Sequence, residues 1–431
     1  MLSSIKQALW GKLTGEEFKR FGILSLTLLL ILGTYWLMKP LKDALFAKMV
    51  GPDFYPYVKI LSFWFTIPLI LLYSKAVDLF EKQNLFYIFS AFYGSLFFII
   101  ALLLAHPTIG LANTTPSKYR ILGWALYVTI ETFGSLMVAL FWAFVASSTN
   151  TDSAKRGYAL IIAGAQIGTI AGPYIALSAP TLGIPLLMFC ICGGVALVPV
   201  LIKIFTHFNP RAAEHHAPSL KTGPIEGLKL LLTRPYLLGV MGVSVLYDIV
   251  ATILEFQMVS LANSQFHSTE HLARFLSYFG LMTNGSALLI SLIGTSFLVR
   301  RFGLTFCLVI YPVITAIALL HILWIPALYV VVGALVVIKS LNYALNNPCK
   351  EMLYIPTSRD IKFKAKSWID MFGNRSAKAG GGFLSTFFTQ AHELIFYGPL
   401  LSLGVVGVWI IIALYTGTTH RALEKSNRTI E

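Results

Sequence analysis

Long apolar runs dominate the chain, and they recur from one end to the other with short polar interruptions. A run of about 20 apolar residues is what a helix needs to cross the hydrocarbon core of a bilayer. The alternating pattern of membrane-barrel strands is absent from the sequence. We therefore predict an all-α polytopic membrane protein with twelve transmembrane helices. The predicted spans lie at about 22–38, 57–73, 85–105, 121–146, 158–178, 183–205, 236–262, 276–299, 302–322, 324–345, 367–390 and 396–417.

The longest polar connection lies between the sixth and seventh predicted spans and divides the chain into two halves of six helices. We expect an N-terminal bundle at 1–206, a central cytoplasmic loop at 207–235 and a C-terminal bundle at 236–431. The polar turn after the second span has a counterpart in Arg300 to Gly303, after the eighth. Two matching halves of this kind predict a major-facilitator-like fold, whose halves rock about a central site.

The chain has 431 residues, 56% of them hydrophobic, and a formal net charge of +14. In a soluble protein this excess would suggest a nucleic-acid partner. Here most Lys and Arg fall in loops on one side of the predicted membrane, and the positive-inside rule explains them without nucleic acid. The opposite loops carry far fewer: Lys39 to Lys59, Lys118, Arg120 and Arg274.

An even number of spans places both termini on the basic side, so we expect both in the cytoplasm. The first 20 residues show no cleavage signature and no Ser/Arg-rich transit peptide. We therefore expect a multi-pass protein of a bacterial inner membrane, acting as a monomer in the lipid bilayer.

Recognisable catalytic motifs are missing from the sequence: there is no nucleophile elbow, no metal cluster and no phosphate-cradling glycine loop after a strand. The four cysteines lack metal-ligand spacing and fit small buried apolar residues. We predict that the protein is not an enzyme and uses no cofactor or metal.

Ionisable residues within or next to the apolar runs are the main functional candidates, because charge inside a bilayer is costly unless it faces a cavity or a partner. The structural alternatives are an interface anchor for Lys42 and interhelical ion pairs for the others. The candidates are Lys42, next to Asp43, and Glu131, Asp248, Glu255, Lys339 and Lys350.

These candidates suggest an anion site. Asp248 and Glu255 are seven residues apart and share one helix face, which is typical of a helix that lines a cavity. Lysines neutralise phosphate as point charges, and acids in the same cavity hold them when it is empty, or carry protons. We hypothesise that residues of both halves converge on one aqueous chamber.

The stretch from Asn342 to Gly382 concentrates charge in a chain that is only 12% charged. We interpret it as half of the anion site. Its three consecutive glycines, Gly380 to Gly382, predict close helix packing.

Several segments spread over nearly the whole length carry a more specific pattern. They are Tyr35 to Leu45, Gly51 to Lys59, Leu72 to Tyr87, Glu131 to Ser135, Phe141–Trp142, Ala154 to Tyr158, Arg300 to Gly303 and Pro348 to Pro356, followed by Lys364, Lys366, Ile369, Asp370, Gly373, Arg375 and Lys378. These segments resemble the non-mitochondrial ATP/ADP translocases, the nucleotide transporters of plastids and of intracellular bacteria such as chlamydiae and rickettsiae.

The resemblance implies exchange of ATP for ADP and phosphate, or proton-driven nucleotide uptake. It implies that four charged positions of the family, here Lys42, Glu131, Glu255 and Lys350, are functionally important, and Lys339 matches a further family lysine.

Three lysines usual in the family are replaced in this chain. Val259 and Leu261 stand four and six residues beyond the seventh-span glutamate, and Asn342 replaces a lysine of the tenth span. Fewer cations favour a ligand with less phosphate charge, or a nucleotide other than ATP.

Two alternatives stay open at this point. One is a proton-coupled carrier of another phosphorylated or anionic metabolite or cofactor on the same fold. The other is a membrane receptor or assembly protein without transport, which has no reason to bear the cost of these buried charges. Asp248 has no counterpart that the resemblance places; it is a candidate proton site, which would make the protein a symporter.

Overall fold

The computed structural model describes residues 14–148, 151–209, 224–357, 361, 365–366, 368–388, 391–426 and 430. Within them the chain is almost entirely helical, with one isolated β-bridge between Thr357 and Ile430. The described helices are α2 (Gly15–Met49), η1 (Pro52–Phe54), α3 (Tyr55–Leu79), α4 (Lys82–Ala105), α5 (Ile121–Ser148), α6 (Thr151–Ala176), α7 (Ala179–Leu182), α8 (Ile184–Phe208), α10 (Pro224–Thr233), α11 (Pro235–Gln265), α12 (Thr269–Phe302), α13 (Leu304–Trp324), α14 (Leu328–Leu341), η2 (Asn342–Asn346), α15 (Asn347–Leu353), η4 (Trp368–Gly373), α16 (Asn374–Ser385) and α17 (Ala391–Ser426).

Each of the twelve predicted spans overlaps a helix. Eight helical stretches of the described residues are long and apolar enough to cross a membrane by length and composition. They are Gly15–Met49, Gln83–Ala105, Ile121–Val145, Ile184–Phe208, Pro235–Gln265, Leu304–Trp324, Leu328–Leu353 and Glu393–Ser426. The all-α, membrane-spanning class is confirmed, whereas the count of twelve spans stays a prediction. One reason is α16, which with 12 residues is shorter than a bilayer crossing requires.

The chain forms two compact units, each described here by itself. Unit 1 comprises Met1–Gly51, Trp64–Ser219 and Phe266–Leu281, and unit 2 comprises Pro52–Phe63, Leu220–Gln265 and Met282–Glu431. Residues 210–223, within the predicted central loop at 207–235, lie outside the described part of the chain. The expected domain boundaries therefore stay a prediction.

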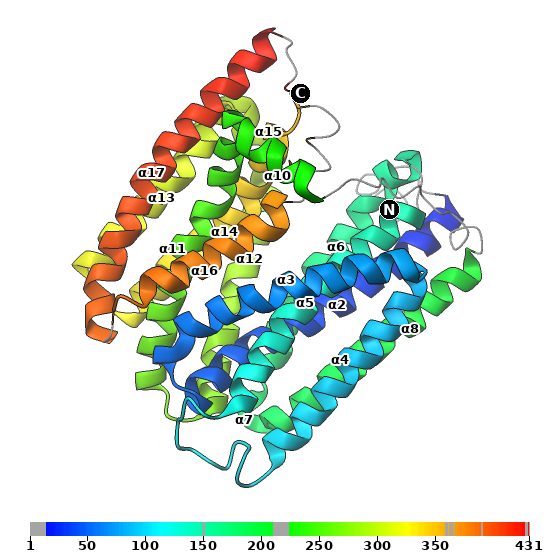
Figure 1. Cartoon of the computed structure of the whole chain (residues 1–431), viewed down its shortest axis with the longest axis vertical. Helices are drawn as coiled ribbons and strands as arrows, with labels where there is room; N and C mark the ends of the chain where they lie inside the picture. The colour runs from blue at the N-terminus through cyan, green and yellow to red at the C-terminus, as the bar shows by residue number, and fades with distance from the viewer. Residues whose placement is uncertain are drawn as a thin grey trace. The chain divides into compact units, whose positions relative to one another are not determined.

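In unit 1, α2 packs along α6 and also contacts α5 and α8, while α4 lies beside α8 (Figure 1). Helix α2 begins with a capping box: the Glu17 amide donates to the Thr14 hydroxyl, and the Thr14 amide donates to the Glu17 carboxylate. Glycines of α6 bring the two helices into backbone contact. A Cβ atom at Gly168 would lie 2.5 Å from the Leu29 carbonyl oxygen, and one at Gly172 would lie 2.4 Å from that of Gly33. This close packing holds α2 in place along α6.

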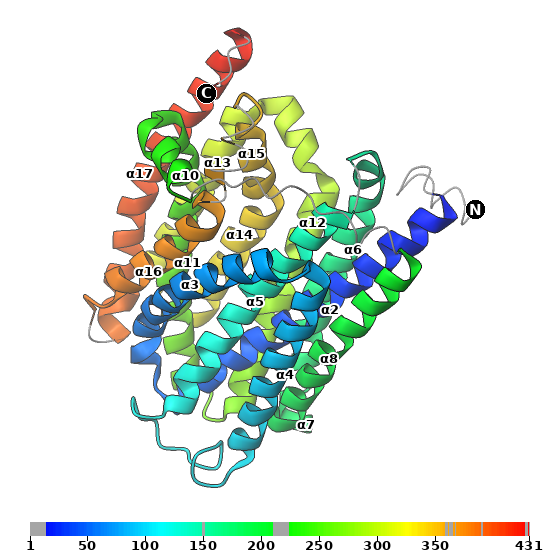
Figure 2. The same ribbon diagram turned by 45° about the vertical axis from the view of Figure 1, so that its right-hand side comes forward.

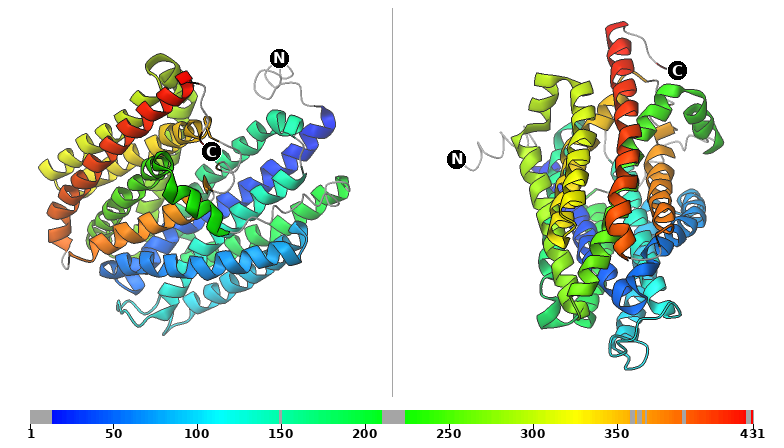
Figure 3. Two further views of the ribbon diagram at one scale, coloured as in Figure 1. Left: turned by 45° about the horizontal axis from the view of Figure 1, so that its top comes forward. Right: turned by 90° about the vertical axis from the view of Figure 1, so that its left-hand side faces the viewer.

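In unit 2, the central element is α11, which packs against α17, α16 and α14 (Figure 2). It is buried along most of its length. Helix α17 also runs along α13 (Figure 3).

Wide π-helical turns interrupt the described part of unit 2, among them η2 and η4. The turn η2 joins α14 to α15 within one continuous helix, and η4 leads directly into α16. Inside η2, the Asn346 amide donates to the Asn342 side-chain oxygen at 3.0 Å. Turns of this kind occur frequently at functional sites.

Candidate functional site

Unit 1 contains a buried group of charges, the Lys42 cluster, made of Lys42, Asp43, Glu131 and Tyr127. The Lys42 ammonium on α2 forms an ion pair with Glu131 of α5 and lies 3.6 Å from an Asp43 carboxylate oxygen. Its Nζ atom is 4.1 Å from the centre of the Tyr127 ring. Since the Lys42 side chain is only 1% exposed, its charge is balanced by these neighbours and not by water.

Small and aromatic residues place α2 against α5 around this cluster. A Cβ atom at Gly134 would lie 2.4 Å from the Tyr35 ring, so glycine makes room for that ring. Phe46 contacts Trp124 and Tyr127 edge to face, with ring centres 5.2 and 5.3 Å apart. These contacts flank the Lys42–Glu131 pair along α2.

Unit 2 contains a second group, the Glu255 cluster, made of Glu255, Lys59 and Lys339. Glu255 lies on α11, and its two carboxylate oxygens bind different lysines. Oε1 forms an ion pair with Lys339 of α14, and Oε2 lies 3.2 Å from Nζ of Lys59, in the second turn of α3. Both lysines are buried.

Asp248 lies seven residues before Glu255 on α11 and is buried, with 8% of its surface exposed. Its Oδ1 atom is 3.9 Å from Nζ of Lys378 on α16, a long ion pair. Both acids on the predicted shared face of α11 therefore form ion pairs with lysines from neighbouring helices.

Lys350 on α15 pairs with Asp370 of η4 at 2.9 Å, and Lys366 pairs with Glu351. Asp370 is about a third exposed, so water screens this pair more than the two clusters. Beside it, burial raises the pKa of the Tyr354 phenol, which therefore stays protonated. Lys362 and Lys364 also belong to the charged stretch from Asn342 to Gly382, but they lie outside the described residues.

The structure thus brings Lys42 to Glu131 in one unit, and Lys339 to Glu255 in the other. Lys350 forms its ion pair with Asp370, which was not among the acids predicted as site residues. The interpretation of Lys59 as a loop cation was wrong, because it lies inside α3 and contacts Glu255. Its position within the predicted span 57–73 was the signal that could have identified it. The roles of these residues in binding stay predictions.

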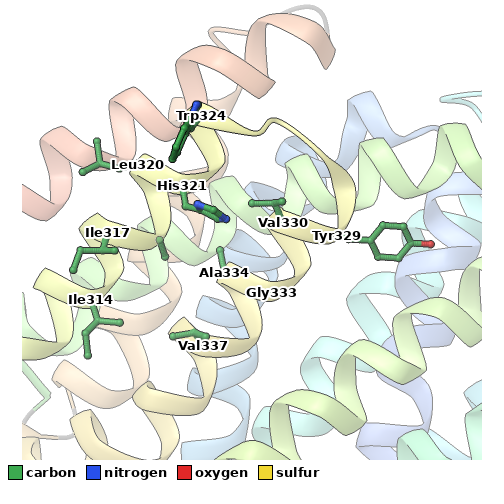
Figure 4. Close-up of a pocket in the computed structure, with 11 residues that line it drawn as sticks. Ile314, Ile317, Leu320, His321, Trp324, Tyr329, Val330, Gly333, Ala334 and Val337 are labelled. Carbon is green, nitrogen blue, oxygen red and sulfur yellow. The ribbon is translucent and has the colours of Figure 1, made fainter.

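A separate groove lies between α13 and α14 in unit 2 (Figure 4). It measures about 710 Å³, and its lining is mostly apolar, with His321 inside and Trp324 and Tyr329 among its aromatic members. None of the charged candidate residues lines it. Across the described ranges, no three His, Cys, Asp or Glu side chains are grouped to hold a metal ion.

Comparison with protein families gives one match over nearly the whole chain: the family model described as TLC ATP/ADP transporter matches residues 1–418. Among curated proteins, the chain is 28% identical over 469 residues to ADP,ATP carrier protein 2, chloroplastic, of Arabidopsis thaliana, which covers 93% of this chain and 75% of the relative. It is 28% identical to ADP,ATP carrier protein 1 of Chlamydia muridarum, over 86% of this chain and 82% of that one. The corresponding carrier of Rickettsia bellii is 23% identical, over 90% and 89%.

Solved structures of similar architecture are transporters. A bacterial homologue of the iron transporter ferroportin matches with a TM-score of 0.64 and 14% identity, over 93% of this chain and 99% of that one. The peptide transporter POT in complex with sulfate matches at 0.60 and 15%, over 95% and 94%. The nucleoside transporter NupG matches at 0.57 and 14%, over 96% and 100%. At such identities the likeness shows the fold alone, and it confirms the predicted major-facilitator-like architecture.

Proposed function

The chain belongs to the TLC ATP/ADP transporter family, and on that premise we propose that it moves nucleotides across a membrane by alternating access. The observation that carries the proposal is the family match over residues 1–418. Relatives from plastids, chlamydiae and rickettsiae bear the name ADP,ATP carrier, and they are transport proteins and not enzymes. The buried lysine–carboxylate pairs of both units supply the chemistry that a phosphate-bearing substrate needs.

In this proposal, Lys42, Lys339 and Lys350 bind phosphate oxygens, while Glu131 and Glu255 occupy the lysines when the carrier is empty. The reason is the cost of a lone charge. Removing one partner of a buried ion pair costs about 3–5 kcal/mol, because the other charge is left uncompensated. A lysine therefore leaves its carboxylate only when a phosphate oxygen takes that place, and this ties the rearrangement of the pairs to the arrival of substrate.

Asp248 is assigned a different role, that of a proton site that would make transport a symport. Its support is its burial and the 3.9 Å distance to Lys378, which is longer than a direct hydrogen bond. Uptake by protein in vesicles without internal nucleotide should then fall when the proton gradient is collapsed. Unchanged uptake would contradict this role.

We place the protein in a bacterial inner membrane as a monomer with both termini in the cytoplasm. The distribution of Lys and Arg over the predicted loops supports the orientation, and the relatives from Chlamydia and Rickettsia support a bacterial membrane. A reporter that is active only in the cytoplasm, fused to the C-terminus, should be active, and an inactive but fully expressed fusion would contradict this orientation.

The function itself is tested with purified protein in proteoliposomes. Labelled ATP should accumulate, and internal ADP should accelerate uptake if the carrier is an exchanger. Unlabelled ATP and ADP should compete, whereas NAD and phosphorylated sugars should not. Competition by one of those metabolites and not by nucleotides would favour the alternative of a carrier for another anion on the same fold.

A further inference from the structure

We propose that Lys59 is a phosphate-binding residue of this carrier, and that Lys59 and Lys339 together take one phosphate group in place of the Glu255 carboxylate. The inference rests on the proposed nucleotide transport. It adds Lys59 on α3 to the proposed substrate-binding residues. It also specifies that the Glu255 cluster binds a phosphate group of the substrate.

The geometry of Glu255 is the first support. Its two oxygens bind two ammonium groups from two different helices, Lys339 through Oε1 and Lys59 through Oε2 at 3.2 Å. A phosphate group also presents several oxygens on one central atom and can bridge two point charges in the same way. The two carboxylate oxygens thus occupy positions that phosphate oxygens can fill.

The charge balance is the second support. The Glu255 carboxylate carries one negative charge, and its two ion pairs join it to two buried lysines. The other carboxylate on this face of α11, Asp248, has its own ion pair with Lys378. A phosphate group with two negative charges would balance the charges of both lysines, whereas the Glu255 carboxylate carries only one negative charge.

The third support is the way α16 holds Lys59 in place. A Cβ atom at Gly382 would lie 2.9 Å from the Pro56 carbonyl oxygen and 3.3 Å from Cβ of Lys59. One at Gly381 would lie 2.8 Å from the Ile249 carbonyl oxygen on α11. Two adjacent glycines therefore let α16 pack closely against both α3 and α11, the helices that carry Lys59 and Glu255.

The test compares how affinity depends on the number of phosphates. Binding of adenosine, AMP, ADP and ATP to the purified full-length protein is measured by calorimetry for the unchanged chain and for Lys59→Gln and Lys59→Arg. We expect Lys59→Gln to weaken ATP and ADP about tenfold or more, the loss of one charge-assisted contact, and to leave adenosine unchanged. Lys59→Arg should retain most of the affinity. The matched control is Lys75→Gln, an exposed lysine on the same helix, which should behave like the unchanged chain.

A double variant separates binding from a purely structural role. If Lys59 only neutralised Glu255, Lys59→Gln combined with Glu255→Gln would regain full ATP affinity, and that result would overturn the inference. We expect the double variant to fold and still to bind ATP weakly. Equal ATP affinity of Lys59→Gln and the unchanged chain would also overturn it, while leaving nucleotide transport intact. Failure of the unchanged protein to bind any nucleotide would instead overturn the proposed function, and this inference with it.

Discussion

The two buried clusters are opposite in composition. In unit 1, one lysine lies between two carboxylates, those of Asp43 and Glu131. In unit 2, one carboxylate lies between two lysines, Lys59 and Lys339. An anion that approaches the Lys42 cluster meets one lysine paired with two carboxylates, whereas an anion that approaches the Glu255 cluster meets two lysines paired with one carboxylate. From this difference we predict unequal roles for residues of the same kind, with the Glu255 cluster as the stronger site for phosphate.

The largest expected effect comes from removing the single cation of the Lys42 cluster. Lys42→Ala removes the lysine that pairs with the buried Glu131 and the partly exposed Asp43, and it should lower the free energy of unfolding by about 3–5 kcal/mol. Lys339→Ala should cost less, about 1–3 kcal/mol, because Lys59 still pairs with Glu255. Unfolding of the nucleotide-free protein in detergent measures both, and equal losses would contradict the opposite composition of the clusters.

A smaller effect is expected from the packing beneath the Glu255 cluster. Gly382→Ala should displace the start of α3 and lower stability by about 1–3 kcal/mol, with weaker ATP binding. The neighbouring Gly380 is a matched control, since a Cβ atom there meets nothing within 4 Å. Gly380→Ala should leave ATP binding unchanged and stabilise the helix by about 0.5–1 kcal/mol. Melting curves and ATP titration of the two variants test this, and equal behaviour would remove the role assigned to the close packing.

The smallest effect is expected at the pair outside both clusters. Asp370→Asn removes the partner of Lys350, but the carboxylate is about a third exposed, so the loss should stay below about 1 kcal/mol. It should shrink further in high salt, because salt screens exposed charges more than buried ones. Melting curves at low and high salt measure both. A loss as large as that of Lys42→Ala would show that Lys350 belongs with the buried clusters.

Much of the fold follows from the sequence, because apolar runs of bilayer length form helices whatever their neighbours are. The charged candidates were found for the same reason: a buried charge is costly and therefore conspicuous in an apolar run. The glycines at 380–382 predicted close packing, and the structure shows it at Gly381 and Gly382 but not at Gly380.

The pairing of the charges could not be predicted, because it depends on which helices pack together. Lys42 and Glu131 are 89 residues apart in the chain, and Lys59 and Glu255 are 196 apart. Lys59 was assigned to a loop from its place near a span end, whereas the close approach of α16 and α3 places it at Glu255. Nothing in the sequence indicates the π-helical turns.

The turn η2 changes the direction in which one lysine of its helix points relative to the other. Lys339 and Lys350 are separated by eleven residues, which in an uninterrupted α-helix make about three full turns and would put both side chains on one side. The wider turn between them holds about one residue more than an α-helical turn and so rotates Lys350 by roughly 100° from that alignment. The extra residue thus turns the two cations of a single helix toward different sides, Lys339 at Glu255 and Lys350 at Asp370.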